Sequence, residues 1–272
     1  MPAQFASIPP DRTAERTLSQ PSSSVVAIPA LSRVLAMALL LVPAIGHAQA
    51  GPPLITNDPD TPGPGAWEIN VAATGAHVGG AWDIDAPDVD INHGVGERVQ
   101  LSLHVPWSHR DNAGAWSSGI GAAEFGVRWR FLDQSQAGIA VAVQPMWISS
   151  VSRAAEQRGL APSNAEFVLP LQAARSFNHW AAGMEIARHF VANEPDAWQA
   201  GVFAEYDCAS TVQCLAEINT SWGDGANTIL DVGARKALSP HLNLLGSIGR
   251  QVTGHAEDRA ALVFYLGAQF LY

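Results

Sequence analysis

Two serine–histidine pairs are the residues whose types and spacing come closest to catalytic chemistry. Ser102 and His104 are two positions apart and share one face of a β-strand, where an imidazole could activate a serine hydroxyl as a nucleophile. Ser108 and His109 are adjacent, in a segment that we interpret as a loop. The sequence has no H-E-x-x-H, G-x-S-x-G or P-loop motif. We therefore favour the interpretation that Ser102 and His104 are ordinary polar residues of a strand, and we expect no catalytic residue, no metal and no cofactor.

The two cysteines, Cys208 and Cys214, are too widely spaced for a C-x-x-C redox motif. They bracket a tight turn between two predicted strands, where residues this far apart in sequence can lie opposite each other. In an oxidising compartment this placement predicts a structural disulfide. Two free thiols are the alternative.

The charge balance excludes one class of partner and favours one class of fold. The 272 residues carry 15 Lys and Arg against 25 Asp and Glu, and this net charge of -10 argues against nucleic acid as a partner. Charged residues make up only 15% of the chain, against about 25% in average soluble domains. No internal apolar run reaches the roughly 18 residues that a membrane helix needs. A charge-poor chain without such a run is typical of a transmembrane β-barrel, which has outer-membrane lipid as a partner.

Apolar residues alternate with polar ones along most of the chain, and this period of two predicts β-strands with two different faces. In the last segment every second residue from Leu262 to Tyr272 is apolar, whereas Tyr265, Gly267 and Gln269 lie on the other face. Such a strand is an aggregation-prone edge in a soluble protein but has no free edge in a closed barrel. We predict twelve strands, at 66–74, 82–93, 99–107, 121–131, 139–147, 164–174, 180–189, 198–207, 212–222, 228–235, 242–250 and 261–272.

An even strand number is typical of bacterial barrels, so the predicted fold class is all-β, a 12-stranded antiparallel transmembrane β-barrel over residues 66–272 with short periplasmic turns. A soluble β-sandwich is the alternative. The longer connections are predicted at 108–120, 148–163 and 251–259. The apolar parity of the second strand slips, and one extra residue at Ala86-Pro87 restores it, so we predict a β-bulge there.

Aromatic residues give an independent indication of a membrane barrel, because indole rings prefer the interface between membrane and water. Only Trp116 falls in a predicted loop. Phe270 and Tyr272 on the terminal strand resemble the signal read by the barrel-insertion machinery, which we expect as a partner. The other eight tryptophans lie at or near predicted strand ends and are expected to form two interface girdles: Trp67, Trp82, Trp107, Trp129, Trp147, Trp180, Trp198 and Trp222.

Charged residues lie on the strand faces opposite the apolar residues. A mid-membrane Arg or Lys facing lipid costs about 2 to 4 kcal/mol, so the charged faces are predicted to line the lumen. Asp83 and Asp85 join this face if the bulge is real. The predicted lumen and selectivity residues are Glu68, Asp88, Asp90, Glu124, Arg128, Arg130, Glu166, Glu185, Glu205, Glu217, Asp231 and Arg235.

This charged face allows two interpretations. In the first, the lumen is a wet path for small solutes, and rings of charge set its selectivity. Because acids outnumber arginines, cationic and zwitterionic solutes are then expected to pass more readily than anions. In the second, Glu and Arg pair across the lumen and plug it, which leaves a structural barrel. We expect Arg128 and Arg130 to pair with acids on neighbouring strands, such as Glu124 or Glu166.

The N-terminal residues predict export. Residues 1–50 are interpreted as an N-terminal extension and a secretory signal peptide, because Arg33 precedes a short apolar core and Ala48-Gln-Ala50 matches an A-x-A cleavage site. Residues 51–65 are rich in Pro and Gly and are interpreted as a periplasmic lead-in before the barrel. The expected location is the outer membrane of a Gram-negative bacterium, after signal-peptide export.

Three stretches, Pro52–Asn70, Asn92–Leu101 and Gly126–Asp133, resemble the outer-membrane proteins catalogued under the meta-pathway of phenol degradation. The resemblance spans nearly all of 52–272 and brings no catalytic motif, so the chain is expected not to be an enzyme. It implies a porin-like channel or transporter for passive uptake or efflux of small solutes, such as small aromatic, cationic or zwitterionic compounds. The alternatives are a structural or envelope-interaction barrel without transport and, resting on Ser102 and His104, a lipid-modifying outer-membrane enzyme.

Overall fold

The structure is a computed structural model that describes residues 51–112, 114–223, 225–254 and 259–272. The predicted extension and signal peptide, residues 1–50, lie outside the described residues. Within the described ranges, no helix is long and apolar enough to cross a membrane. The described residues are mainly strands, joined by connections of which two carry a single helical turn.

The alternating sequence forms strands along almost its whole length from residue 67 onward. Two short helices, α2 (Gln134–Ala137) and α3 (Arg153–Gln157), lie in connections. The strand segments are β1 (Trp67–Val78), β2 (Ala81–Val95), β3 (Val99–Asn112), β4 (Ala115–Ile120), β5 (Ala122–Leu132), β6 (Ala140–Val143), β7 (Met146–Ser150), β8 (Glu166–Phe177), β9 (Trp180–Val191), β10 (Ala197–Ala209), β11 (Val212–Gly223), β12 (Gly225–Ser239), β13 (Leu242–Gln251) and β14 (Ala260–Leu271).

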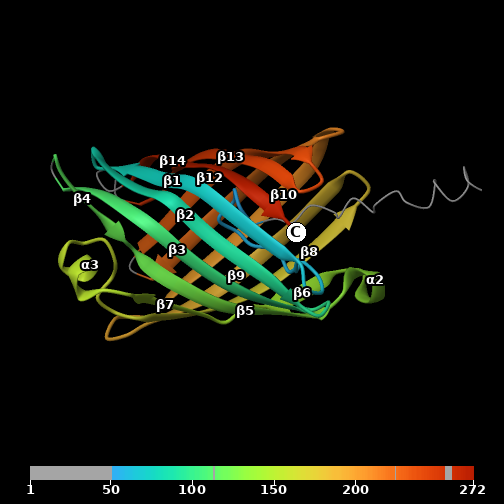
Figure 1. The fold of residues 1–272 in the computed structure, drawn as a ribbon, viewed down its shortest axis with the longest axis horizontal. Coiled ribbons are helices and arrows are strands. Elements are labelled where there is room, and N and C mark those ends of the chain that lie inside the picture. Colours follow the sequence, from blue (N-terminus) through green and yellow to red (C-terminus); the bar gives the residue numbers. More distant parts are fainter. Residues whose placement is uncertain (1–50, 113, 224, 255–258) are drawn as a thin grey trace, which may run out of the picture. The chain divides into compact units, whose positions relative to one another are not determined.

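The described segments form a closed antiparallel barrel of twelve strands (Figure 1). Segments β4 and β5 are consecutive parts of one strand, and both pair with β3. Segments β6 and β7 are likewise parts of one strand, interrupted at Gln144-Pro145, and both pair with β5 and β8. The predicted fold class is therefore confirmed, and the soluble sandwich is excluded.

The first and last strands close the ring. Asn70 of β1 lies opposite Gln269 of β14 in an antiparallel register. Beyond that register, the backbone N–H groups of Trp67 and Tyr272 each donate to the other residue's carbonyl oxygen, at 2.9 Å in both cases. Closure pairs β14 with β1 on one side and with β13 on the other, which explains how so apolar a terminal strand is tolerated.

The predicted bulge in β2 is confirmed. Ala86 and Pro87 together lie opposite the single residue Ala73 of β1, and the register of β2 with β3 shifts at the same place. The extra residue restores the parity of the strand, so Asp83 and Asp85 lie on the same face as the acids that follow the bulge.

Two predicted connections differ from the structure. Within the predicted loop 108–120, residues 108–112 belong to β3 and residues 115–120 form β4, so Trp116 lies on a strand and Trp107 lies well before the end of β3. These residues are mostly polar and lack the apolar alternation of the other strands, so the sequence does not indicate that they pair. The connection after β5 was predicted to be a tight turn, but it carries α2.

Burial follows the predicted parity of the strands. Apolar side chains that point outward are exposed, such as Leu266 at 69% and Val232 at 58%. Polar side chains that point inward are almost fully buried, such as Gln172 at 0% and Asn70 at 1%. An apolar exterior around a polar interior is the arrangement of a barrel that meets lipid outside.

Candidate functional site: the barrel lumen

The twelve predicted lumen residues all lie on the inner strand face. The alternation of each strand and its register with its neighbours place them there; for example, Glu217 of β11 lies directly opposite Asp231 of β12. Seven of these residues are buried: Glu68, Arg128, Glu185, Glu205, Glu217, Asp231 and Arg235. The other five are Asp88, Asp90, Glu124, Arg130 and Glu166, and they are partly exposed.

Residues 51–61 lie inside the barrel rather than outside it, which corrects the prediction of a periplasmic lead-in. Thr56 is 0% exposed and Asp58 is 3% exposed. The Glu217 carboxylate accepts the backbone N–H groups of Ile55 at 2.7 Å and Thr56 at 2.9 Å. Leu54 packs with the inward-facing Phe203 and Leu215 in one apolar cluster. We call residues 51–61 the lumen segment.

Two inward arginines of β5 hold the acidic part of the lumen segment. Arg128 donates to the backbone oxygen of Asp60 at 2.7 Å and lies 3.7 Å from the Asp58 carboxylate. Arg130 pairs with the Asp60 carboxylate at 2.8 Å and with Asp133 at 2.9 Å.

The expectation that these arginines pair with Glu124 or Glu166 is wrong, because those two acids bind histidines instead. Glu124 lies 3.2 Å from Nδ1 of His104, and Glu166 lies 2.5 Å from Nδ1 of His189. The lumen segment supplies the acids that the arginines bind.

The carboxyl group of Asp58 is the most deeply buried titratable group of the lumen segment. Burial raises its pKa well above the usual value for aspartate, the charge of Asp60 raises it further, and the Arg128 guanidinium opposes both. Because this raised pKa belongs to the docked segment, protonation of Asp58 on lowering the pH favours the docked form.

The far side of the lumen also contacts this segment. Arg235 donates to the backbone oxygen of Pro52 at 3.2 Å, and Ser247 donates to that of Pro53 at 2.9 Å. At Gly201 on β10 a Cβ atom would lie only 1.9 Å from Oγ1 of Thr56, so the segment reaches the barrel wall where that wall has no side chain. The segment is therefore fixed at both walls of the lumen and narrows it.

A cavity of about 220 Å³ remains beside the lumen segment. Strands β1, β2, β3 and β5 supply most of its polar walls, and the segment itself closes one side. The acidic side chains at the cavity are Glu68, Asp88, Asp90 and Glu124. Other side chains that line it include Asn70, Asn92, His104, Arg128, Met146 and Tyr265.

Neither serine–histidine pair is arranged for catalysis. The ring nitrogens of His104 bind the carboxylates of Asp88 and Glu124, while Ser102 accepts from the Gln144 amide at 3.5 Å. His109 binds Oγ of Ser118 at 2.7 Å and the Ala86 carbonyl oxygen at 3.0 Å.

No group of three or more His, Cys, Asp and Glu side chains in the described part of the chain could hold a metal ion.

The eight tryptophans predicted to form girdles lie on the outer face, but two of them are not at strand ends. Seven of the eight are exposed by 38% to 53%, while Trp82 is only partly exposed and packs near His77 and Phe264. Trp107 and Trp147 are not at strand ends, because β3 continues to Asn112 and because β6 and β7 form one longer strand. On the terminal strand, Tyr272 stacks near His241 and Phe270 lies opposite Ile69.

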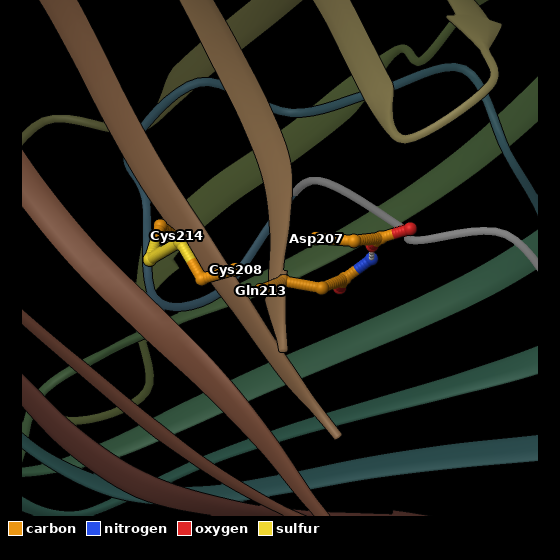
Figure 2. Close-up of a disulfide and its surroundings, with 4 residues drawn as sticks. All are labelled: Asp207, Cys208, Gln213 and Cys214. Carbon is orange, nitrogen blue, oxygen red and sulfur yellow. Dashed lines mark hydrogen bonds between the residues drawn. A yellow bond between two sulfur atoms is a disulfide. The ribbon is translucent and has the colours of Figure 1, made fainter. Parts of the chain in front are cut away.

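A disulfide joins Cys208 to Cys214 across the hairpin of β10 and β11, with 5.8 Å between the Cα atoms (Figure 2). Beside it the Gln213 amide donates to Asp207 at 3.2 Å, which also ties the two strands. The register places Tyr206 opposite Cys214, so the bridge is diagonal to the strand pairing.

Sequence reasoning missed the neutral half of the lumen. Inward-facing amides form a chain in which Gln172 donates to Gln144 at 3.0 Å and to Glu185 at 2.9 Å, while Gln144 accepts from Arg128 at 2.9 Å. These amides occupy the same strand parity as the charged residues, so extending the parity rule from charged to all polar side chains would have found them.

No family model and no curated protein sequence matches the chain. Among solved structures, the barrel is similar to an outer membrane channel from Pseudomonas putida F1, with a TM-score of 0.63 and 11% identity over 82% of this chain and 100% of that one. It is also similar to the KdgM porin (TM-score 0.53, 10% identity, 75% and 98% covered) and the NanC porin (0.52, 9%, 76% and 99%). At these identities the likeness shows the fold, which is that of outer-membrane channel and porin barrels.

Proposed function

We propose that this protein is an outer-membrane channel for the passive movement of small solutes. The observation that carries the proposal is a closed barrel with an apolar exterior, a polar interior and an acid-lined cavity in that interior. The likeness of the fold to a channel and two porins supports it. A resemblance to the phenol-degradation group of outer-membrane proteins extends the candidate solutes to small aromatic compounds.

The proposed location is the outer membrane of a Gram-negative bacterium. Signal-peptide export would deliver the chain to the periplasm, and the terminal strand with Phe270 and Tyr272 would be read by the barrel-insertion machinery. The disulfide between Cys208 and Cys214 supports an oxidising compartment. The barrel end that holds Trp67 and Tyr272 would then face the periplasm.

A second candidate function is a structural barrel that conducts nothing. The lumen segment favours it, because its contacts with Glu217, Arg128 and Arg130 fill part of the interior. The two candidates differ in one measurable property, which is the ion conductance of the intact barrel.

Single-channel recording in planar bilayers across a KCl gradient tests the proposal. We expect discrete conductance steps with a reversal potential on the cation-selective side, because acids dominate the inner face. Replacing two of these acids, Asp88→Asn with Asp90→Asn, should lower the cation-to-anion permeability ratio by about threefold, since two distant charges change the energy of a hydrated ion by less than about 1 kcal/mol.

The matched control removes two negative charges outside the lumen, Glu194→Gln with Asp196→Asn, and should leave the permeability ratio unchanged. Both residues lie in the connection between β9 and β10. Anion preference in the unmodified protein would contradict the predicted selectivity. A complete absence of conductance would support the structural barrel instead.

A further inference from the structure

We propose that the cavity beside the lumen segment is a binding site for a small organic cation that carries an ammonium or guanidinium group. This inference rests on the proposed function, because it names the class of solute that the lumen would hold. It concerns binding at a fixed place, which is a separate property from the ion selectivity of the whole lumen.

The cavity presents two carboxylates, Glu68 and Asp90, whose hydrogen-bond partners carry no charge. The partners of Glu68 and Asp90 at hydrogen-bond distance among the described residues are amides: Nδ2 of Asn70 donates to both carboxylates at 3.1 Å, and Nδ2 of Asn92 donates to Asp90 at 2.8 Å. An amide donates a hydrogen bond but carries no compensating charge. Two carboxylates held in this way favour a cationic ligand.

The two basic side chains that line the cavity, Arg128 and His104, make their hydrogen bonds and ion pairs with other groups. Arg128 donates to Gln144 at 2.9 Å and to the backbone oxygen of Asp60 at 2.7 Å. His104 lies between Asp88 and Glu124 and binds both. These contacts account for the other two acids at the cavity and leave the pair formed by Glu68 and Asp90 for a ligand.

A buried acceptor without a donor gives an independent indication of the ligand. Asn70 is 1% exposed and lines the cavity, and its Oδ1 atom has no hydrogen-bond partner among the described residues. The orientation of this amide is set by its nitrogen, which donates to two carboxylates. The empty acceptor calls for a donor, and an ammonium or guanidinium group supplies several donors together with the positive charge.

The shape of the cavity favours an organic cation over a metal ion. A volume of about 220 Å³ holds a molecule of several heavy atoms. The acids do not converge as metal ligands, because no described cluster of three or more His, Cys, Asp and Glu could hold a metal. Tyr265 and Met146 also line the cavity and offer an aromatic and an apolar wall for the carbon chain of such a ligand.

Isothermal titration calorimetry on the full barrel in a neutral detergent tests the proposal, with 1,4-diaminobutane as the probe. We expect saturable binding of the diamine and no binding of 1,4-butanediol or succinate. Both have a similar length, but the diol is neutral and succinate is negatively charged. Glu68→Gln and, separately, Asn70→Ala should each weaken diamine binding about tenfold or more, because the first removes a negative charge beside the ammonium group and the second removes the buried acceptor. Asp196→Asn, which removes an acid outside the lumen, should bind as the unmodified protein does.

Folding of each variant is checked by the shift in gel mobility that intact barrels show before heating. Asp90→Asn, which keeps the size of the side chain and removes the second negative charge, serves as the second variant and should also weaken diamine binding. Equal binding of diamine and diol, or a Glu68→Gln barrel that is folded and binds normally, would overturn the proposal. Conductance without diamine binding would overturn the proposed binding site and leave the proposed channel intact. Diamine binding without conductance would overturn the channel and leave the binding site intact.

Discussion

At the scale of single residues, the bridge between Cys208 and Cys214 is the feature with the most direct chemical test. It closes a loop within one hairpin, with a sequence separation of 6. Loop-closure entropy for so short a loop gives a stabilisation of about 2 kcal/mol, because the gain grows with loop length. Mass spectrometry of protein alkylated without reduction should find neither cysteine modified. Replacing both with serine should lower the midpoint of unfolding slightly and leave the barrel folded; alkylated thiols in the exported protein would contradict the bridge.

At the scale of elements, the bulge in β2 determines whether the residues that precede it in this strand face the lumen or the outside. Deleting Ala86 removes the extra residue and turns Asp83 and Asp85 toward the outer face, which also costs Asp85 its 2.8 Å ion pair with Arg110. We expect the deletion to destabilise the barrel by about 1 to 3 kcal/mol. Thermal unfolding followed by gel mobility measures this loss.

Deleting Ser163, which lies in the long connection after β7, is the matched control for the bulge deletion. This residue is exposed and belongs to no strand, so its loss should leave the unfolding temperature unchanged. Equal stability of the two deletion variants would mean that the bulge does not determine the register.

The lumen segment is an element whose position can be changed through one residue of the wall. Gly201→Ala places a methyl group where Oγ1 of Thr56 lies, so it should displace the segment and break its two bonds to Glu217. Each bond to a charged acceptor contributes about 1.5 to 3 kcal/mol. We expect proteinase K to cleave residues 51–61 in the variant but not in the unmodified barrel, and single-channel conductance to rise.

Gly246→Ala is the matched control for this substitution, because a Cβ atom there meets nothing closer than 3.8 Å. It should leave both the cleavage pattern and the conductance unchanged. A Gly201→Ala barrel that is folded and still protects residues 51–61 would contradict the placement of the segment inside the lumen.

At the scale of the whole molecule, the sequence predicts the barrel well and its contents poorly. The alternation of apolar residues with a period of two predicts which residues face lipid. The shift in this alternation at Ala86 is visible because the alternation elsewhere is strict. Residues 51–61 have no period, and their Pro and Gly content fits an external strap as well as a packed internal segment. Their partners are also far away in sequence, since Thr56 binds Glu217 across 161 positions. Local patterns carry no information on such a contact.

The ring has one seam, where β1 meets β14, and the lumen segment lies just upstream of that seam. Asn70 and Gln269 are about 200 positions apart, so this pairing closes the longest loop in the barrel and is expected to form slowly. The lumen segment must either enter the ring before β1 pairs with β14 or thread through one end of the closed barrel afterwards. A chain in which β1 pairs with β14 before the lumen segment has entered would therefore hold an unfilled barrel until the segment threads in from one end.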